Sequence, residues 1–432
     1  MTKRLKNLSN LSILLLLCVS ILSGFIFSTE KYSIATDRNI SVKLSTTSHD
    51  LLWNYTCSEG IRSVSLSADG NLITVSTYSG DSRVYLFDNV ESTSKEPLWN
   101  YTAPNSVYSA DISADGTYIA GVDDSQHIFL LNSSITDPKL PIWEYSPTGS
   151  VMNDAKISAD GNYIIAASST GIIFLLNNSV ESPKTLMWSY ATGGDVWSVD
   201  ISADGTYIVV ASQDNNVYLF NKASSTPLWN YTAGGFVNSV GISADGNYIV
   251  AGTADSKVHL FSRTSSTPLW TFSADNVVYT VAISANGNYI VTGGEDSTVY
   301  LFERTNSIPL WNYTATDQFG ANDHPRCVAI SANGDYIAAG CHDFNIFLFK
   351  KSNSTPLWNY TTTGEVHCIA ISEKGDYIVA GGDGRQVYLF YNEIPSAAQN
   401  IPFTNLFVLF IIATVLVTVL IKRNLRKIKV KN

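Results

Sequence analysis

The sequence predicts an all-β protein with the fold of an eight-bladed β-propeller. A tryptophan recurs eight times at intervals of 41 to 47 residues, and each lies in the first of four short β-type runs. A turn signal follows the second run of each unit. With 45% hydrophobic, 12% aromatic and 15% charged residues, the 432-residue chain can bury a large core, which excludes a disordered or coiled-coil protein.

The first segment is expected to be a signal peptide or signal anchor at residues 1–29, followed by a linker at residues 30–50. Lys3, Arg4 and Lys6 precede an uncharged stretch of 17 residues. That length exceeds a typical signal-peptide core and is slightly short for a bilayer span. No A-x-A-like site follows the stretch, so both alternatives stay open.

A transmembrane helix is expected at residues 401–421, after a linker at residues 392–400. The stretch has 21 residues without a charge, and the tail at residues 422–432 carries six Lys and Arg residues. A helix of this length crosses a hydrocarbon core of ~30 Å. Because basic residues flank both apolar segments on their outer ends, the positive-inside rule places both termini in the cytoplasm. We therefore expect a single-pass or double-pass cell-membrane protein with an extracytoplasmic middle.

The segment between these ends is acidic, with 18 Lys and Arg residues against 37 Asp and Glu residues. This balance argues against nucleic-acid binding, which requires a basic surface. Nine N-x-S/T sequons between residues 39 and 361 are compatible with an exported glycoprotein, although five are copies of one Trp-Asn-Tyr-Thr motif.

The eight repeat units have the same internal order. The clearest copy has Pro-Leu-Trp-Asn-Tyr-Thr at 227–232, apolar runs at 237–243, 248–252 and 258–261, and Ala-Asp-Gly at 244–246. Near-continuous apolar runs indicate blades that are buried on both faces by their neighbours. The repeated tryptophans are Trp53, Trp99, Trp143, Trp188, Trp229, Trp270, Trp311 and Trp358.

Asp-Gly or Asn-Gly stands between the second and third runs in seven units, and Lys374-Gly375 stands there in the eighth. Such a pair supplies the positive φ angles of a tight hairpin, and turn chemistry explains these aspartates better than a calcium loop does. The chain opens with a Trp run, and its last three runs, within 366–390, have no Trp run after them. We therefore expect the Trp53 strand to complete the eighth blade, which removes a free edge. Residues 51 and 391 would then lie on one face, toward the membrane.

Two stretches resemble known propeller families. Residues 198–209 read Ser-Val-Asp-Ile-Ser-Ala-Asp-Gly-Thr-Tyr-Ile-Val and resemble WD repeats, although Leu-Phe stands where that family has Trp-Asp. The Leu-Phe, polar loop and Pro-Leu-Trp of residues 219–229 resemble the tryptophan-docking repeats of quinoprotein-type (PQQ-like) propellers. The resemblance covers residues 51–391 and implies the fold, whereas both families include enzymes and scaffolds.

A PQQ-dependent oxidoreductase is the enzyme that this resemblance implies. Such enzymes usually have adjacent cysteines, an acidic calcium cluster and long insertions, whereas this chain has no Cys-Cys and few insertions. No Gly-x-Ser-x-Gly, His-Glu-x-x-His or phosphate-binding loop occurs. We therefore expect a protein- or glycan-binding scaffold with no catalysis and no cofactor. A membrane-protein assembly factor, resembling propeller lipoproteins, is the other alternative, although a helical anchor with a basic tail disfavours it.

Cysteines and histidines gather in the last two units. Cys327, Cys341, Cys368, His324, His342 and His367 all lie there, and ring closure would add Cys57. Buried thiols, a disulfide and a metal site remain alternative interpretations.

The candidate binding site is a ring of residues at one repeat position, five before the Ser of Ser-Ala-Asp-Gly. The neighbouring positions repeat, but this one does not, and it collects residue types that concentrate binding energy. Because it starts the innermost strand, we expect it to surround the channel mouth that faces away from the membrane, overhung by the loop at 317–325. A ring of polar caps on a wet channel is the alternative. The ring residues are Arg62, Tyr108, Asn153, Trp197, Asn238, Tyr279, Arg326 and His367.

Overall fold

The computed structural model describes residues 49–78, 80–134, 139–149, 151–179, 184–315 and 325–394. The expected signal segment, the transmembrane helix, the basic tail and nearly all of both linkers lie outside these residues. Within the described part of the chain, no helix has the length and hydropathy that a membrane crossing requires.

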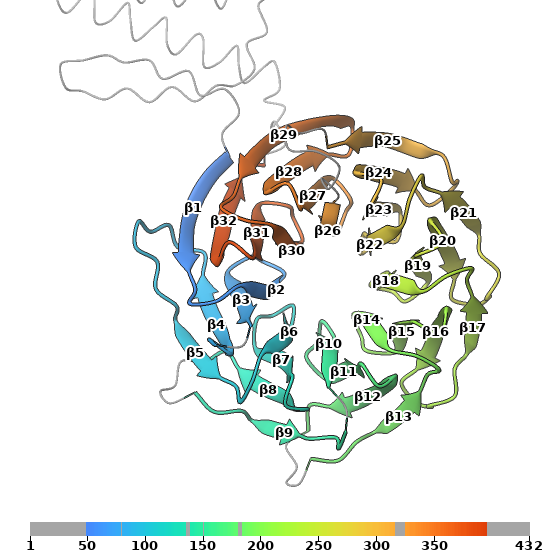
Figure 1. Ribbon diagram of the computed structural model, residues 1–432, viewed down its shortest axis with the longest axis horizontal. Coiled ribbons are helices and arrows are strands. Elements are labelled where there is room, and N and C mark those ends of the chain that lie inside the picture. Colours follow the sequence, from blue (N-terminus) through green and yellow to red (C-terminus); the bar gives the residue numbers. More distant parts are fainter. Residues whose placement is uncertain are drawn as a thin grey trace, which may run out of the picture.

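Eight four-stranded antiparallel sheets surround a central axis, which confirms the all-β, eight-bladed propeller (Figure 1). The inner strands are β2 (Ile61–Leu66), β6 (Val107–Ile112), β10 (Met152–Ile157), β14 (Val196–Ile201), β18 (Val237–Ile242), β22 (Val278–Ile283), β26 (Pro325–Ile330) and β30 (Val366–Ile371). The second strands are β3 (Leu72–Thr77), β7 (Tyr118–Asp123), β11 (Tyr163–Ser168), β15 (Tyr207–Ser212), β19 (Tyr248–Thr253), β23 (Tyr289–Gly294), β27 (Tyr336–Cys341) and β31 (Tyr377–Gly382).

The third strands are β4 (Arg83–Asp88), β8 (Ile128–Asn132), β12 (Ile172–Asn177), β16 (Asn216–Asn221), β20 (Lys257–Ser262), β24 (Thr298–Glu303), β28 (Asn345–Lys350) and β32 (Gln386–Asn392). The outer strands of blades one to seven are β5 (Trp99–Thr102), β9 (Trp143–Tyr145), β13 (Trp188–Ala191), β17 (Trp229–Thr232), β21 (Trp270–Ser273), β25 (Pro309–Thr314) and β29 (Asn353–Thr361). The eighth outer strand is β1 (His49–Thr56).

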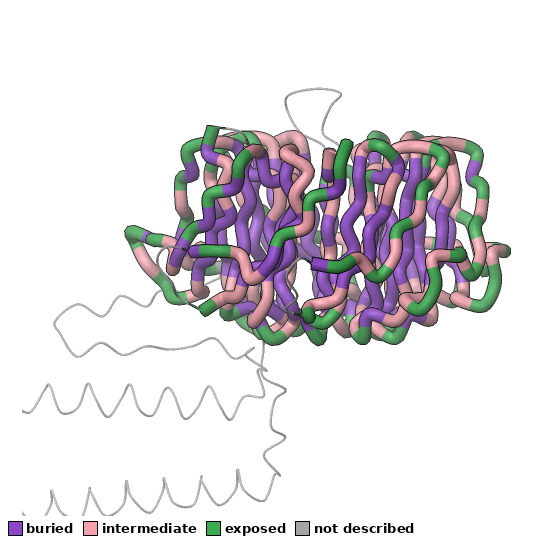
Figure 2. Tube along the Cα trace, turned by 90° about the horizontal axis from the view of Figure 1, so that it is seen from below, coloured by how far each residue is buried: buried purple, intermediate pink, exposed green. Residues whose placement is uncertain are grey.

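The repeated tryptophans dock each blade onto the next. Trp229, in the outer strand of blade four, packs on Phe261 of blade five with ring centroids 5.4 Å apart. Its indole Nε1 also donates a hydrogen bond to the carbonyl oxygen of Arg263 at 2.8 Å. The same pairing joins Trp270 to Phe302. Second and third strands are buried almost throughout, as the purple band in Figure 2 shows, so blade-to-blade packing provides the core.

The N-terminal strand closes the ring, as the repeat pattern predicts. β1 pairs antiparallel with β32, with Asp50 opposite Tyr391 and Thr56 opposite Gln386. In Figure 1, β1 lies beside β32 at the outer edge of the eighth blade. The first and last strands of the described ring therefore share one sheet, and β32 is paired on both sides instead of forming an exposed edge.

The register defines two faces. We call the face that holds His49 and Asn392 the chain-end face, and the Ser-Ala-Asp-Gly turns lie on it because the inner strands end there. The inner strands begin on the opposite side, which we call the distal face, since Val366 pairs with Gly382 beside the turn that leads to Gln386.

Side chains and backbone groups at the chain-end face lock the blades to one another. Backbone N–H groups of successive turns donate to the carbonyl of the next blade at 2.9–3.4 Å, and the circle has eight such bonds. Eight aliphatic side chains, among them Leu66 and Ile371, line a hollow of about 320 Å³ at this end of the channel, together with seven alanines and Glu373. This mouth is small and largely apolar, in contrast to the distal one.

Candidate functional site

All eight ring residues occupy the second position of an inner strand at the distal face. In every blade the pairing register between the inner and second strands shifts at this residue, as between Val196 and Ser198 around Trp197. Each ring residue is thus the extra residue of a β-bulge, a device that redirects a side chain and leaves its position out of the ladder. The repeat pattern located the position but gave no signal of the bulge.

Arg62 and Tyr108 contact each other across blades one and two. The Arg62 guanidinium lies over the Tyr108 ring at 4.7 Å and over the Tyr78 ring at 5.2 Å. Its Nη1 also donates a hydrogen bond to the Tyr78 hydroxyl at 2.9 Å. The result is a layered cation–π surface that orders the arginine and keeps its charge on the distal face.

Asn153 and Asn238 are engaged within the protein. The Asn153 side-chain amide donates to the carbonyl oxygen of Val196 at 3.0 Å, and that of Asn238 donates to Val278 at 2.9 Å. Each carbonyl belongs to the first inner-strand residue of the following blade. These two ring members therefore bridge neighbouring blades.

Trp197 and Arg326 are the exposed members of the ring. Half of the Trp197 surface is open to solvent. Arg326 is also exposed. Burial and the charge of Glu295 raise the pKa of Tyr279, and the charge of Arg326 partly offsets this rise. Of the expected overhanging loop, only Pro325 belongs to the described residues.

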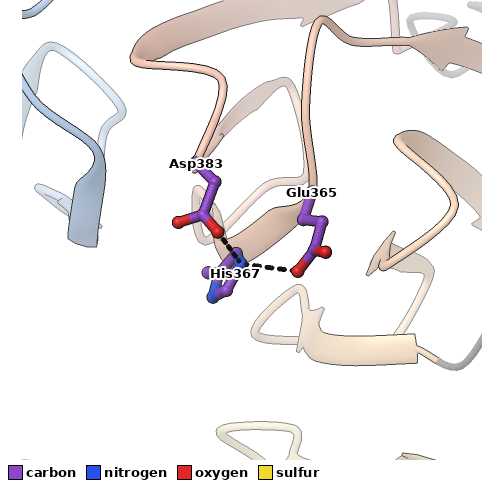
Figure 3. Close-up of side chains that lie close together, drawn as sticks. All are labelled: Glu365, His367 and Asp383. Carbon is purple, nitrogen blue, oxygen red and sulfur yellow. Dashed lines mark hydrogen bonds and ion pairs between the residues drawn. The ribbon is translucent and has the colours of Figure 1, made fainter.

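His367 lies in a network of ionisable groups on blades seven and eight (Figure 3). Its Nε2 is 3.2 Å from Oε2 of Glu365 and 3.3 Å from Oδ2 of Asp383. The other oxygen of Glu365 lies 2.9 Å from Nε2 of His342. Two histidines and two carboxylates thus meet where the pattern placed one ring residue.

Sequence reasoning missed a second ring, one residue beyond each second strand and 16 residues after the first ring. Three of its members, Tyr78, Glu295 and Asp383, touch or influence ring residues as described above. A fourth, His342, contacts Glu365, two residues before the ring residue His367. The signal was present, because this position also varies between units. Its remaining members are Asp124, Ser169, Gln213 and Ala254.

Three charged residues lie on the inner strands of blades two to four. Asp111, Lys156 and Asp200 stand at one repeat position, where blades five to eight have only Gly or Ala. The charge of Asp111 raises the pKa of Lys156 despite its burial. Burial raises the pKa of Asp200 to about 6, against hydrogen bonding from the Ile242 N–H and the charge of Lys156. At this position the inner strands of blades two to four are therefore ionic, and those of blades five to eight are not.

Cys57, Cys327, Cys341 and Cys368 form no disulfide, and they pack in or against the hydrophobic core. Cys57, Cys327 and Cys341 belong to three different hydrophobic clusters. Burial raises the pKa of both Cys57 and Cys368 to about 12, so neither is a thiolate at neutral pH. Among the described residues no cysteine forms a disulfide or belongs to a cluster of potential metal ligands, which supports the packing interpretation. His324 lies outside the described residues.

The fold is that of a tryptophan-docking β-propeller, because its blades have four strands, its tryptophans pack on the next blade, and β1 closes the ring by pairing with β32. The family model described as outer membrane protein assembly factor BamB matches residues 142–332 and 237–388. A second model, described as WD domain, G-beta repeat, matches residues 49–88. Because the first model covers more than half of the chain, the protein belongs to this PQQ-like propeller family, and the double resemblance is confirmed. The search of curated proteins finds no match.

Proposed function

We propose that this protein is a non-catalytic scaffold that binds a protein partner on its distal face. The observation that carries the proposal is the ring of eight bulged positions, whose residues differ between otherwise repeating blades. Trp197 and Arg326 stand exposed in that ring, and Phe236 and Phe344 are exposed on the same face. Aromatic and arginine side chains of this kind concentrate binding energy at protein interfaces.

The family supports a protein as the partner, since the matching model is described as an assembly factor. Our proposal places the propeller outside the cell membrane, anchored through residues 401–421, with the distal face turned away from the bilayer. His49 and Asn392 lie on one face, which suits two tethers that reach the same membrane. A glycan as the partner is the alternative outcome of the binding experiment.

Binding is tested by affinity capture with the full-length protein, followed by mass spectrometry of proteins and glycans. The triple variant R62A/W197A/R326A should no longer capture the partner. Its free energy of unfolding should lie within ~1–2 kcal/mol of the wild-type value. The matched control is L228A/L269A/L310A, which removes three exposed side chains from the outer rim. A ring variant that captures its partner normally would contradict the site, and a stoichiometric glycan would replace the protein partner.

Topology is tested separately by adding protease to intact cells. The propeller should be digested while a tag after residue 432 is spared. A protected propeller with a digested tag would contradict the proposed orientation.

A further inference from the structure

Four side chains from two adjacent blades converge at the distal face. His342 follows β27 of blade seven, and Asp383 occupies the equivalent position after β31 of blade eight. Glu365 and His367 flank the first residue of β30, the inner strand of blade eight. The fold thus brings two turns and one strand start to a single point, which Figure 3 shows for three of the four residues.

The donor atoms of Glu365, His367 and Asp383 have the separations of a coordination polyhedron. One atom from each lies within 4.8 Å of the other two, and the His367 Nε2 distances to the carboxylates are 3.2 and 3.3 Å. Ligands about 2.0–2.2 Å from a tetrahedral cation are about 3.3–3.5 Å apart. The two histidine–carboxylate distances therefore match those around a small cation, and the Glu365 and Asp383 oxygens lie within 4.8 Å of each other.

The charges also fit a divalent cation. Among the described residues, the ion pairs of Glu365 and Asp383 run to histidines alone, so neither carboxylate is neutralised by Lys or Arg. Of the ring arginines in the two neighbouring blades, Arg62 is stacked on Tyr78 and Tyr108 toward blade two, and Arg326 of blade seven acts on Tyr279 of blade six. Two carboxylates with one imidazole leave a local charge that a divalent ion balances.

We propose that Glu365, His367 and Asp383 bind a divalent cation of the zinc type, with His342 orienting Glu365 from behind. An imidazole with carboxylates suits Zn²⁺ and its first-row neighbours, whereas Ca²⁺ and Mg²⁺ prefer an all-oxygen set. The Asp383 side chain is 53% exposed, so solvent reaches the site and supplies further ligands. The ion fastens the β31–β32 turn to the start of the inner strand and fixes this sector of the distal face.

His342 is a positioning residue in this arrangement. It holds the Glu365 oxygen that does not face His367, at 2.9 Å. Partners of this kind fix the orientation of a ligating carboxylate, and their loss typically weakens metal binding about 10–100-fold.

The experiment is a calorimetric titration of full-length, untagged protein with zinc chloride after chelator treatment and its removal. We expect one Zn²⁺ per chain. H367Q and D383N should each abolish zinc binding. The Asp383 side chain is exposed, so D383N should leave folding intact. H342Q should weaken zinc binding about 10–100-fold. The matched control is H127Q, because His127 also pairs with an aspartate, at 3.0 Å, in the corresponding turn of blade two.

Two results would overturn the proposal: wild-type protein that takes up no Zn²⁺, or H367Q and D383N proteins that bind it as the wild type does. Because zinc alone is the probe, the outcome does not depend on the protein partner. A failed titration leaves the scaffold function standing, and a failed capture leaves the metal site standing.

Discussion

The backbone N–H of Glu373 donates to the carbonyl oxygen of Ala68 at 3.0 Å, and this bond joins the eighth blade to the first. It completes the circle of interblade hydrogen bonds at the chain-end face. Every turn in that circle both donates and accepts through the backbone, so the contact needs no particular side chain. This explains why Glu373 can stand where seven blades have alanine.

Removal of residues 50–58 should open the ring. The deletion takes away most of β1 and exposes β32 as a free edge, so we expect aggregation and a lower melting temperature. Deletion of residues 30–45, which precede β1, is the control and should melt like the intact chain. Equal melting of the two deletions would argue against closure through β1.

Gly205→Ala should destabilise the protein by about 2–4 kcal/mol. Gly205 has φ of +69°, and a Cβ there would lie 2.3 Å from Cδ2 of Tyr163 in the preceding blade. Gly149→Ala is the matched control, since its φ is +80° but nothing lies within 4 Å. Chemical denaturation should give about 1–2 kcal/mol for the control, and similar losses for both variants would refute the steric contribution.

Asn153→Ala and Asn238→Ala should each cost about 1 kcal/mol of unfolding free energy, because each leaves an interblade carbonyl without its donor. Trp197→Ala, at the same repeat position, should cost less than about 0.5 kcal/mol. Urea titrations of the three variants provide the comparison. A larger loss for Trp197 than for the asparagines would contradict the division of the ring into bridging and exposed members.

Asp200 should make the protein less stable as the pH rises from 4 to 7. Its pKa is about 6 in the folded protein and 3.8 as its ordinary value, so the folded state retains a proton that the unfolded state has lost. The folded protein disfavours the ionised carboxylate of Asp200, so the free energy of unfolding should fall by about 1–3 kcal/mol across this pH range. Asp200→Asn should flatten the pH dependence measured by denaturation relative to that of the wild type. An unaltered slope in Asp200→Asn would contradict the assignment.

Cys57, Cys327, Cys341 and Cys368 should resist alkylation at pH 7 until the protein is unfolded, since burial raises the pKa of Cys57 and Cys368 to about 12 and that of Cys327 as well. Mass spectrometry after iodoacetamide treatment, with and without denaturant, measures this. Disulfide-linked peptides in an unreduced digest would contradict free thiols.

The blades were predictable because each repeats a local cause. A tryptophan that docks on the phenylalanine of the next blade, as Trp229 does on Phe261, must recur with the unit. The turn glycines recur for the same reason, since each requires a positive φ. Repetition therefore revealed the tryptophan docking and the glycine turns, whose side-chain requirements recur in the units.

Contacts made once left no such signal. Whether Asn153 faces a partner or the Val196 carbonyl depends on the bulge geometry, which residue types do not encode. Two neighbours in sequence can also have different surroundings in the fold. Cys341 ends β27 in the core, whereas the next residue, His342, reaches Glu365 at the surface.

The bulge at each ring position uncouples recognition chemistry from folding. A residue without a partner in the strand ladder can be exchanged while the surrounding sheet keeps its hydrogen bonds, so duplicated units can diverge there at little cost in stability. One rigid frame thus carries eight side chains that can be exchanged, at a cost of about 1 kcal/mol where they bridge blades, as Asn153 and Asn238 do. A combinatorial library confined to these eight codons would vary the specificity of the surface while the scaffold stays constant, which makes the protein a starting point for selecting new binders.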